Sequence, residues 1–146
     1  MTYAGRLDKD SEGLILLSND GDLINSMMRG ANGHEKEYVV KVNGRLTGDI
    51  CDKMKEGVYI SELDRTTKPC RIYNITNNSD NTTTFNIVLT EGLNRQIRRM
   101  CELFNLKVIR LTRIRVLNIR LGKLAPGSSR RITGDELKEL YSIVGR

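Results

Sequence analysis

Carboxylates alternate with cations in one short segment near the start of the chain. Between Gly5 and Gly13 the sequence reads Arg6-Leu7-Asp8-Lys9-Asp10-Ser11-Glu12. Nearby positive charge favours the ionised form of a carboxyl group. An ionised carboxylate can act as a nucleophile or stabilise an oxocarbenium ion. A surface turn with ordinary salt bridges would use the same residues, and composition alone favours that simpler interpretation.

A second group of charges lies in segment 91–100, at the start of a predicted helix. Arg95, Arg98 and Arg99 crowd its first turns, where the helix N-terminus already carries partial positive charge. A phosphate, or a carboxylate from another part of the fold, would offset these cations. The segment therefore favours an anion site over a purely structural helix start.

Segment 108–119 alternates β-branched residues with arginines. Arg113 and Arg115 fall on one side of the predicted strand, and Ile114 and Val116 fall on the other. This pattern predicts a half-exposed strand that presents positive charge. Tyr38 lies in another segment rich in β-formers, 37–42, where a tyrosine more often packs in a core or at an edge than serves a functional site.

Positive charge is concentrated in one part of the chain. Segment 94–131 holds eleven basic residues and one acidic residue, a net charge of +10, whereas the remainder holds 13 basic and 17 acidic residues, a net charge of −4. Segregation of this kind favours a surface that binds a polyanion such as RNA, with salt-dependent affinity. A solvated face of unpaired arginines is the alternative.

Other classes of protein are disfavoured by composition. The longest apolar run, 13–17, is far shorter than the roughly 20 residues that span a bilayer, and there is no pattern of a secretory signal. The three cysteines, Cys51, Cys70 and Cys101, together with the single His34 match no zinc spacing. We therefore expect a cytoplasmic protein with reduced, buried or half-buried thiols.

The periodicity of the sequence predicts an α+β fold with a largely antiparallel or mixed sheet. Strands are expected at 13–18, 37–42, 71–76, 84–90 and 108–119. Helices are expected at 20–29, 47–56 and 94–104 and from residue 133 onward. Asp20, Thr47 and Asn94 are the expected helix caps, and Thr133 with Glu136 forms the pattern of a capping box.

Taken together, the segments resemble the RsuA/RluB/RluE/RluF family of pseudouridine synthases. The predicted helix 94–104 and segment 113–118 look closest to the RluF branch. The resemblance spans nearly the whole chain. It is carried by Gly5-Arg6-Leu7-Asp8, Gly13-Leu14, Asn19-Asp20-Gly21, Glu35-Lys36-Glu37-Tyr38, Glu91-Gly92, segment 94–100, segment 111–115, Leu121-Gly122 and Pro126-Gly127. It implies the pseudouridine synthase fold, a mixed, mainly antiparallel sheet with flanking helices and a central cleft.

The resemblance also implies roles for individual residues. Asp8 would attack a flipped uridine and break its N-glycosidic bond, and Tyr38 would stack on the base and help to remove a proton. Arg98 would pair with Asp8. Arg6 would enter the duplex where the base is extruded, and Leu111 would pack beside the base. Flipping is required because the reacting atoms are inaccessible within a base stack.

A structured stem-loop of ribosomal RNA, of the 23S type, is the expected substrate, and Arg95, Arg99, Arg113 and Arg115 are expected to contact it. The chemistry needs no metal or organic cofactor, and we expect a monomer. Members of the family usually carry an S4-type RNA-binding module and a first catalytic strand before the motif at Gly5. Residues 1–146 are therefore expected to be the catalytic domain without them, with weaker or less selective RNA binding than a full-length relative.

Two alternatives remain at this point. A non-catalytic domain that binds ribosomal RNA would need the same basic segment. A hydrolase or metal site could use Asp8, Asp10 and Glu12, because alternate residues share one face of an extended strand. The neighbouring cations Arg6 and Lys9 would oppose a divalent ion there.

Overall fold

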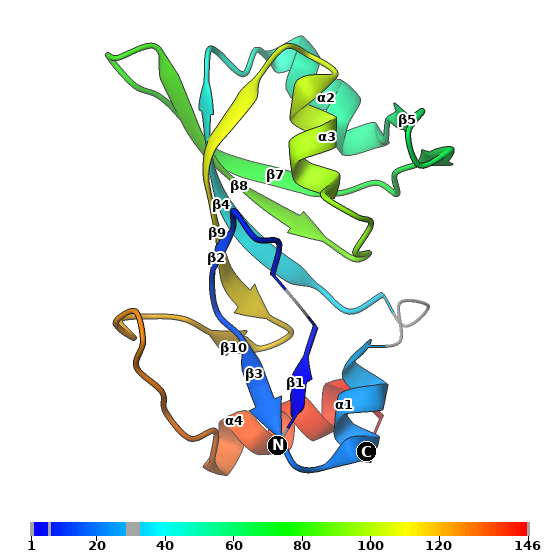
Figure 1. The fold of residues 1–146 in the computed structure, drawn as a ribbon, viewed down its shortest axis with the longest axis vertical. Coiled ribbons are helices and arrows are strands. Elements are labelled where there is room, and N and C mark those ends of the chain that lie inside the picture. Colours follow the sequence, from blue (N-terminus) through cyan, green and yellow to red (C-terminus); the bar gives the residue numbers. More distant parts are fainter. Residues whose placement is uncertain (1, 6, 29–32, 146) are drawn as a thin grey trace.

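The computed structural model describes residues 2–5, 7–28 and 33–145, which form ten strands and four helices (Figure 1). The helices are α1 (Gly21–Met28), α2 (Gly48–Glu56), α3 (Gln96–Glu102) and α4 (Gly134–Ile143). The strands are β1 (Thr2–Ala4), β2 (Glu12–Gly13), β3 (Leu16–Ser18), β4 (Lys36–Asn43), β5 (Tyr59–Ile60), β6 (Arg65–Thr66), β7 (Arg71–Asn77), β8 (Thr82–Leu89), β9 (Lys107–Val116) and β10 (Ile119–Arg120).

A six-stranded sheet is the centre of the fold. Its order is β10-β9-β4-β8-β7, and these neighbours are antiparallel. The short strand β2 joins the sheet by pairing in parallel with β9. Two further antiparallel pairs, β1 with β3 and β5 with β6, lie outside it. The predicted α+β class with a mixed, mainly antiparallel sheet is confirmed.

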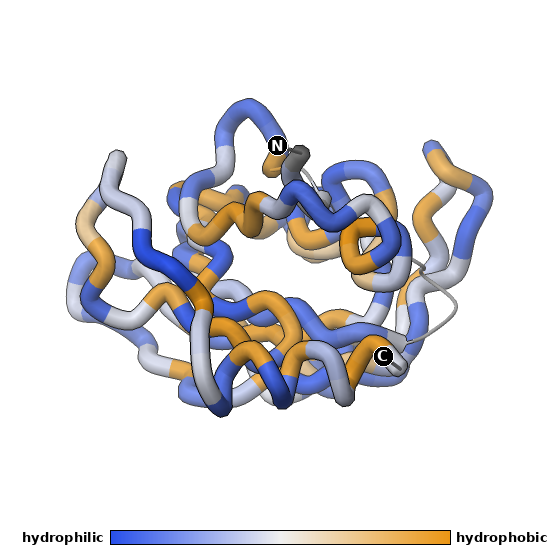
Figure 2. Tube along the Cα trace, turned by 90° about the horizontal axis from the view of Figure 1, so that it is seen from below, coloured by the Kyte–Doolittle hydropathy of each residue, from blue (hydrophilic) through white to orange (hydrophobic). Residues whose placement is uncertain are grey.

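Two hydrophobic clusters stabilise this arrangement. The larger cluster lies where α2 and α3 pack on the sheet and includes Met54, Phe85 and Met100, which are fully buried. The second cluster joins α1, α4 and β3 to the end of β9 and includes Leu16 and Leu140. Figure 1 shows these two groups of helices at opposite ends of the long axis. In Figure 2, hydrophilic residues predominate in the peripheral loops.

The N-terminal ends of two helices follow the prediction. The Asp20 carboxylate accepts a hydrogen bond from the Leu23 amide at 3.1 Å, and the Thr47 hydroxyl accepts one from the Ile50 amide at 3.4 Å. Each side chain satisfies an amide that has no partner within its helix. Both caps are confirmed.

Predictions at the starts of the other two helices are wrong. Helix α3 begins at Gln96 after Arg95, whose φ of 49° is left-handed and whose side chain caps nothing. Asn94 instead accepts a hydrogen bond from Arg99. Before α4, the Thr133 side chain makes no capping bond, and the Glu136 carboxylate, the other member of the predicted capping box, is bound by Arg130.

None of the helices in the described part of the chain is long and apolar enough to cross a membrane. All three cysteines are free thiols, two buried and one half-buried, as predicted. Burial raises the pKa of Cys70 to about 11 and that of Cys101 to about 12. These two thiols therefore stay protonated near neutral pH and are poor nucleophiles.

Candidate active site

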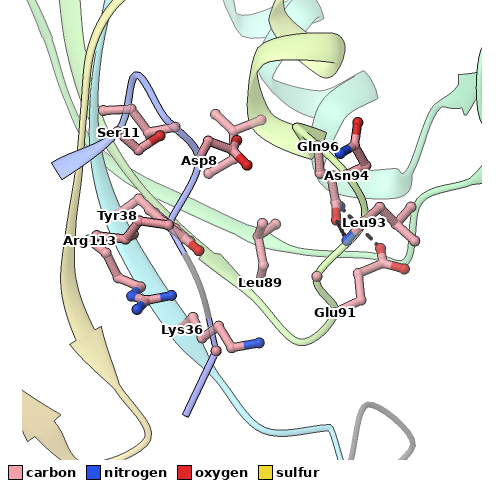
Figure 3. A pocket seen from close by; sticks show the side chains of 15 residues that line it. Asp8, Ser11, Lys36, Tyr38, Leu89, Glu91, Leu93, Asn94, Gln96 and Arg113 are labelled. Atoms are coloured by element: carbon pink, nitrogen blue, oxygen red, sulfur yellow. Dashed lines mark hydrogen bonds between the residues drawn. The ribbon is translucent and has the colours of Figure 1, made fainter. Parts of the chain in front are cut away.

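One pocket brings together segments that are far apart in the sequence. It lies where the N-terminal segment, strands β4 and β9, and the loop between β8 and α3 meet (Figure 3), and it measures about 230 Å³. It is lined by Gly5, Leu7, Asp8, Ser11, Lys36, Tyr38, Leu89, Glu91, Gly92, Leu93, Asn94, Gln96, Ile97, Leu111 and Arg113. Its size, slightly below the roughly 300–1,000 Å³ of common ligand sites, suits one small polar ligand.

The N-terminal segment reaches the pocket through a close backbone contact with β9. The amide of Leu14 donates a hydrogen bond to the Arg113 carbonyl at 2.9 Å. Gly13, at φ +123°, precedes it, and a Cβ there would lie 2.3 Å from the Arg113 carbonyl oxygen. Only glycine fits this position, because both the backbone conformation and the space exclude a side chain. The contact places residues 7–11 over the sheet.

Asp8 and Tyr38 lie in the pocket, as the prediction of a shared site requires. Both side chains are half-buried, and Figure 3 shows them within the same cavity, Asp8 from the N-terminal loop and Tyr38 from β4. The Ser11 amide donates to the Asp8 carbonyl at 3.0 Å and closes a backbone turn that begins at Asp8. Leu111 is buried and lines the same wall.

The predicted ion pair between Arg98 and Asp8 is absent. Arg98 donates instead to the Asp10 carbonyl at 2.8 Å and to the Ser11 hydroxyl at 3.5 Å. Within residues 2–5, 7–28 and 33–145, no ion pair shorter than 4.0 Å involves Asp8. Arg98 therefore contacts the loop that carries Asp8 rather than its carboxylate, because the loop turns its main-chain and hydroxyl oxygens toward α3.

Protein groups surround the other arginines near α3. Arg95 lies 3.8 Å from a carboxylate oxygen of Asp10, and Arg99 donates to the carbonyl and side-chain oxygens of Asn94 at 3.0 and 2.9 Å. The sequence left open whether a phosphate or a carboxylate from another segment offsets these cations. The structure supplies such a carboxylate, that of Asp10. Arg95 and Arg99 remain half-exposed at the rim of this region, and Arg6 lies outside the described residues.

Strand β9 presents Arg110 to solvent but buries Arg113 and Arg115, so the prediction that these two arginines are its exposed, charged side is wrong. Arg113 is only 2% exposed and lies opposite Tyr38 in β4. It donates to the Leu14 carbonyl at 3.0 and 2.8 Å. Its guanidinium group thus helps to form the pocket wall and to hold the N-terminal segment on the sheet.

Arg115 points away from this pocket, because β9 contains a bulge. Arg115 lies opposite Glu37, whereas Arg113 lies opposite Tyr38, so Ile114 is an additional residue in β9. Adjacent residues of β4 face opposite sides of the sheet. The two arginines therefore point to opposite faces, and not to one face as predicted.

Carboxylates on that opposite face bind Arg115. It is 8% exposed, donates to Glu37 and to Glu35 at 3.1 Å each, and donates to the Leu117 carbonyl at 2.6 Å. The contact of Arg115 with RNA stays a prediction, and each of its three side-chain nitrogens already donates to a protein oxygen.

Several polar residues of the pocket, among them Lys36, Glu91 and Gln96, were not assigned a role from the sequence. Lys36 precedes Tyr38 by two positions. Because alternate residues of a strand share one face, this spacing could have placed Lys36 in the same site as Tyr38. Gln96 accepts a hydrogen bond from the Leu93 amide at 3.3 Å and donates to the Glu91 carboxylate at 3.1 Å. Those contacts stabilise the loop before α3, and no local pattern in the sequence predicts them.

The acids of the N-terminal segment do not converge on one site. Asp10 and Glu12 are exposed and pair with Arg95 and Arg110, while Asp8 alone lines the pocket. No group of three potential metal ligands occurs among the residues that the structure describes. The N-terminal segment thus contributes one carboxylate, Asp8, to a pocket that also contains Tyr38 and the cations Lys36 and Arg113.

The chain belongs to the RNA pseudouridylate synthase family, whose sequence model matches residues 1–103. It is 44% identical over 140 residues to the dual-specificity RNA pseudouridine synthase RluF of Escherichia coli K12, covering 96% of this chain and 46% of that protein. It is 32% identical over 139 residues to the ribosomal large subunit pseudouridine synthase B of Bacillus subtilis, covering 95% and 57%.

A solved pseudouridylate synthase has the same fold. It superposes with a TM-score of 0.84 at 28% identity, over 94% of this chain and 58% of that one. The chain spans about half the length of the curated relatives it matches. The predicted family and its RluF-like character are confirmed.

Proposed function

We propose that this chain carries the catalytic activity of an RNA pseudouridine synthase that isomerises a uridine in ribosomal RNA. The observation that supports it most is the carboxylate of Asp8 beside Tyr38, in a pocket formed largely by segments that the family model covers. The names of the relatives favour RNA as substrate, and the large-subunit name favours 23S ribosomal RNA. We further propose a cytoplasmic, monomeric protein.

The reaction is an isomerisation: the base is detached from the sugar and reattached through another atom, and no atom is added to the nucleotide. Asp8 attacks the flipped nucleotide, the bond between C1′ and N1 breaks, and the freed uracil rotates. A new bond then joins C1′ to C5 as the bond between C1′ and the Asp8 carboxylate breaks, the C5 hydrogen leaves as a proton, and N1 gains a proton. Tyr38 stacks on the base and assists the removal of that proton.

The substitution Asp8→Asn tests the nucleophile. We expect loss of pseudouridine formation, because the amide cannot attack, with little change in RNA affinity. The assay follows tritium released from C5 of labelled uridine in an unmodified 23S ribosomal RNA transcript. Asp10→Asn, two positions away and outside the pocket, is the matched control and should retain most activity. Turnover by Asp8→Asn would exclude this mechanism.

A non-catalytic RNA-binding domain predicts a different result. In that case the wild-type chain would bind the transcript and release no tritium. If tritium is released, the target nucleotide can be identified by mapping pseudouridines in ribosomal RNA from cells that lack the protein and from the same cells after its restoration. A site that disappears and returns would identify the substrate.

A further inference from the structure

We propose that Lys36 is a substrate-binding residue whose ammonium group binds an anionic group of the nucleotide in the pocket. This inference rests on the proposed function. It gives a role to a cation that none of the assigned contacts uses.

Geometry places the ammonium group inside the site. Lys36 is the first residue of β4 and shares a face with Tyr38, two positions later. Figure 3 shows its side chain extending across the cavity toward the loop that contains Glu91. A Cβ added to Gly92 would lie 3.5 Å from Lys36 Nζ. The ammonium group therefore spans the gap between the sheet and the loop before α3.

The ammonium group has no protein partner among the described residues. No hydrogen bond, and no ion pair within 4.0 Å, involves the Lys36 side chain there. Lys36 is nevertheless half-buried. Burial lowers the pKa of Lys36, and the positive charge of Arg113 lowers it further. A desolvated cation without a counter-charge is unfavourable. A bound anion would supply the counter-charge and so offset both the burial of Lys36 and its repulsion by Arg113.

The acids of the pocket leave this cation available. Glu91 accepts hydrogen bonds from the Lys68 amide at 2.7 Å and from Gln96 at 3.1 Å. Asp8 has no ion pair within the described part of the chain. Lys36 is therefore not neutralised by either carboxylate.

Two groups of the same substrate could supply the anion. One is a phosphate next to the flipped uridine, which is charged before the reaction begins. The other is the uracil ring, which carries negative charge once its bond to C1′ breaks. A phosphate contact acts in the ground state and changes KM and RNA affinity, whereas a contact with the departing base acts in the transition state and changes kcat.

The experiment compares Lys36→Met with Lys41→Met on the unmodified 23S transcript. Lys41 lies in the same strand, on the opposite face, and is the matched control. We expect Lys36→Met to lower kcat/KM by about 10- to 100-fold, the range for one charged hydrogen bond. Lys36→Arg should recover part of this loss. The thermal unfolding midpoint of Lys36→Met should be unchanged or higher, because an unpaired buried charge is removed.

The kinetic constants then distinguish the two sources. A raised KM, with a salt slope of binding reduced by about one, identifies the phosphate, and a reduced kcat identifies the uracil charge. A value of kcat/KM within about twofold of Lys41→Met would overturn the proposal, as would a parallel loss of activity and stability.

Failure of the proposed function is distinguishable. If the wild-type chain releases no tritium, that function fails, and Lys36 is tested by equilibrium binding of the same transcript. Unchanged affinity in Lys36→Met would then overturn the binding role as well.

Discussion

Two arginines hold the segment that carries Asp8 through its main chain. Arg98 binds the Asp10 carbonyl and Arg113 binds the Leu14 carbonyl. Guanidinium groups suit this task because they present several donors in a fixed plane. The position of Asp8 therefore depends on donors supplied by the second half of the chain, even where no direct ion pair exists.

Gly13→Ala should displace this segment. The Cβ would lie 2.3 Å from the Arg113 carbonyl oxygen, at a φ that alanine rarely adopts. We expect a loss of about 1–3 kcal/mol in the free energy of unfolding, together with reduced pseudouridine formation. Urea unfolding and the tritium assay measure the two effects.

Gly21→Ala is the control for that substitution. Nothing lies within 4 Å of its Cβ position, and Gly21 starts helix α1. We expect unchanged or slightly increased stability, because alanine favours a helix over glycine. Equal behaviour of the two variants would show that the close contact at Gly13 is unimportant.

At the scale of the elements, four neighbouring strands are joined by a polar network centred on Glu37. This carboxylate of β4 is 2% exposed and accepts hydrogen bonds from Tyr73 in β7, from Asn86 in β8 at 3.0 Å and from Arg115 in β9 at 3.1 Å. A buried charge is tolerated only when it is paired in this way. The network lies on the face of β4 opposite Tyr38 and fixes the strands that carry the pocket.

Glu37→Gln should reduce stability in a manner that depends on pH. Burial raises the pKa of Glu37, but hydrogen bonds from Tyr73, Asn86 and Arg115 outweigh it, so the pKa lies below its ordinary value. The charged form therefore stabilises the fold above the ordinary pKa, and this contribution is lost as the pH falls through the lowered pKa. At pH 7 we expect the variant to lose about 1–3 kcal/mol.

Urea unfolding at pH 7 and near pH 4 measures the effect of Glu37→Gln. The difference from wild type should shrink at the lower pH. Glu136→Gln, which alters a more exposed pair with Arg130, should cause a smaller change. A difference that stays constant with pH would contradict the assigned charge of Glu37.

Across the whole molecule, net positive charge is less concentrated at the surface than the linear sequence suggests. Arg113 and Arg115 are buried, and Arg110 pairs with Glu12. Other cations, such as Arg120 and Lys123, remain exposed. The exposed cations are the ones that can release counterions from RNA.

Arg120→Ala should therefore flatten the salt dependence of RNA binding. The slope of log affinity against log salt falls by about 0.7 to 0.9 for each phosphate that the protein no longer neutralises. Arg65→Ala, an exposed position in the β5–β6 pair, should leave the slope unchanged. Titrations of the 23S transcript at several salt concentrations measure both, and identical slopes for wild type and Arg120→Ala would remove Arg120 from the RNA-binding surface.

The class of fold, the family resemblance and the helix caps at Asp20 and Thr47 could all be predicted from the residues alone. These features depend on local periodicity and on residue types at short spacing. The same information predicted that Asp8 and Tyr38 share a site, because the order of the motifs resembles one family.

Tertiary structure alone decided which charges are buried and what they bind. Arg115 and Glu37 are separated by 78 positions, and Arg98 and Asp10 by 88. One additional residue in β9 sends Arg113 and Arg115 to opposite faces. A prediction from strand periodicity assumes regular alternation and therefore cannot locate such a bulge. The partners of a buried charge are set by which distant segments pack together, and Lys36 became a candidate only when the pocket around it was known.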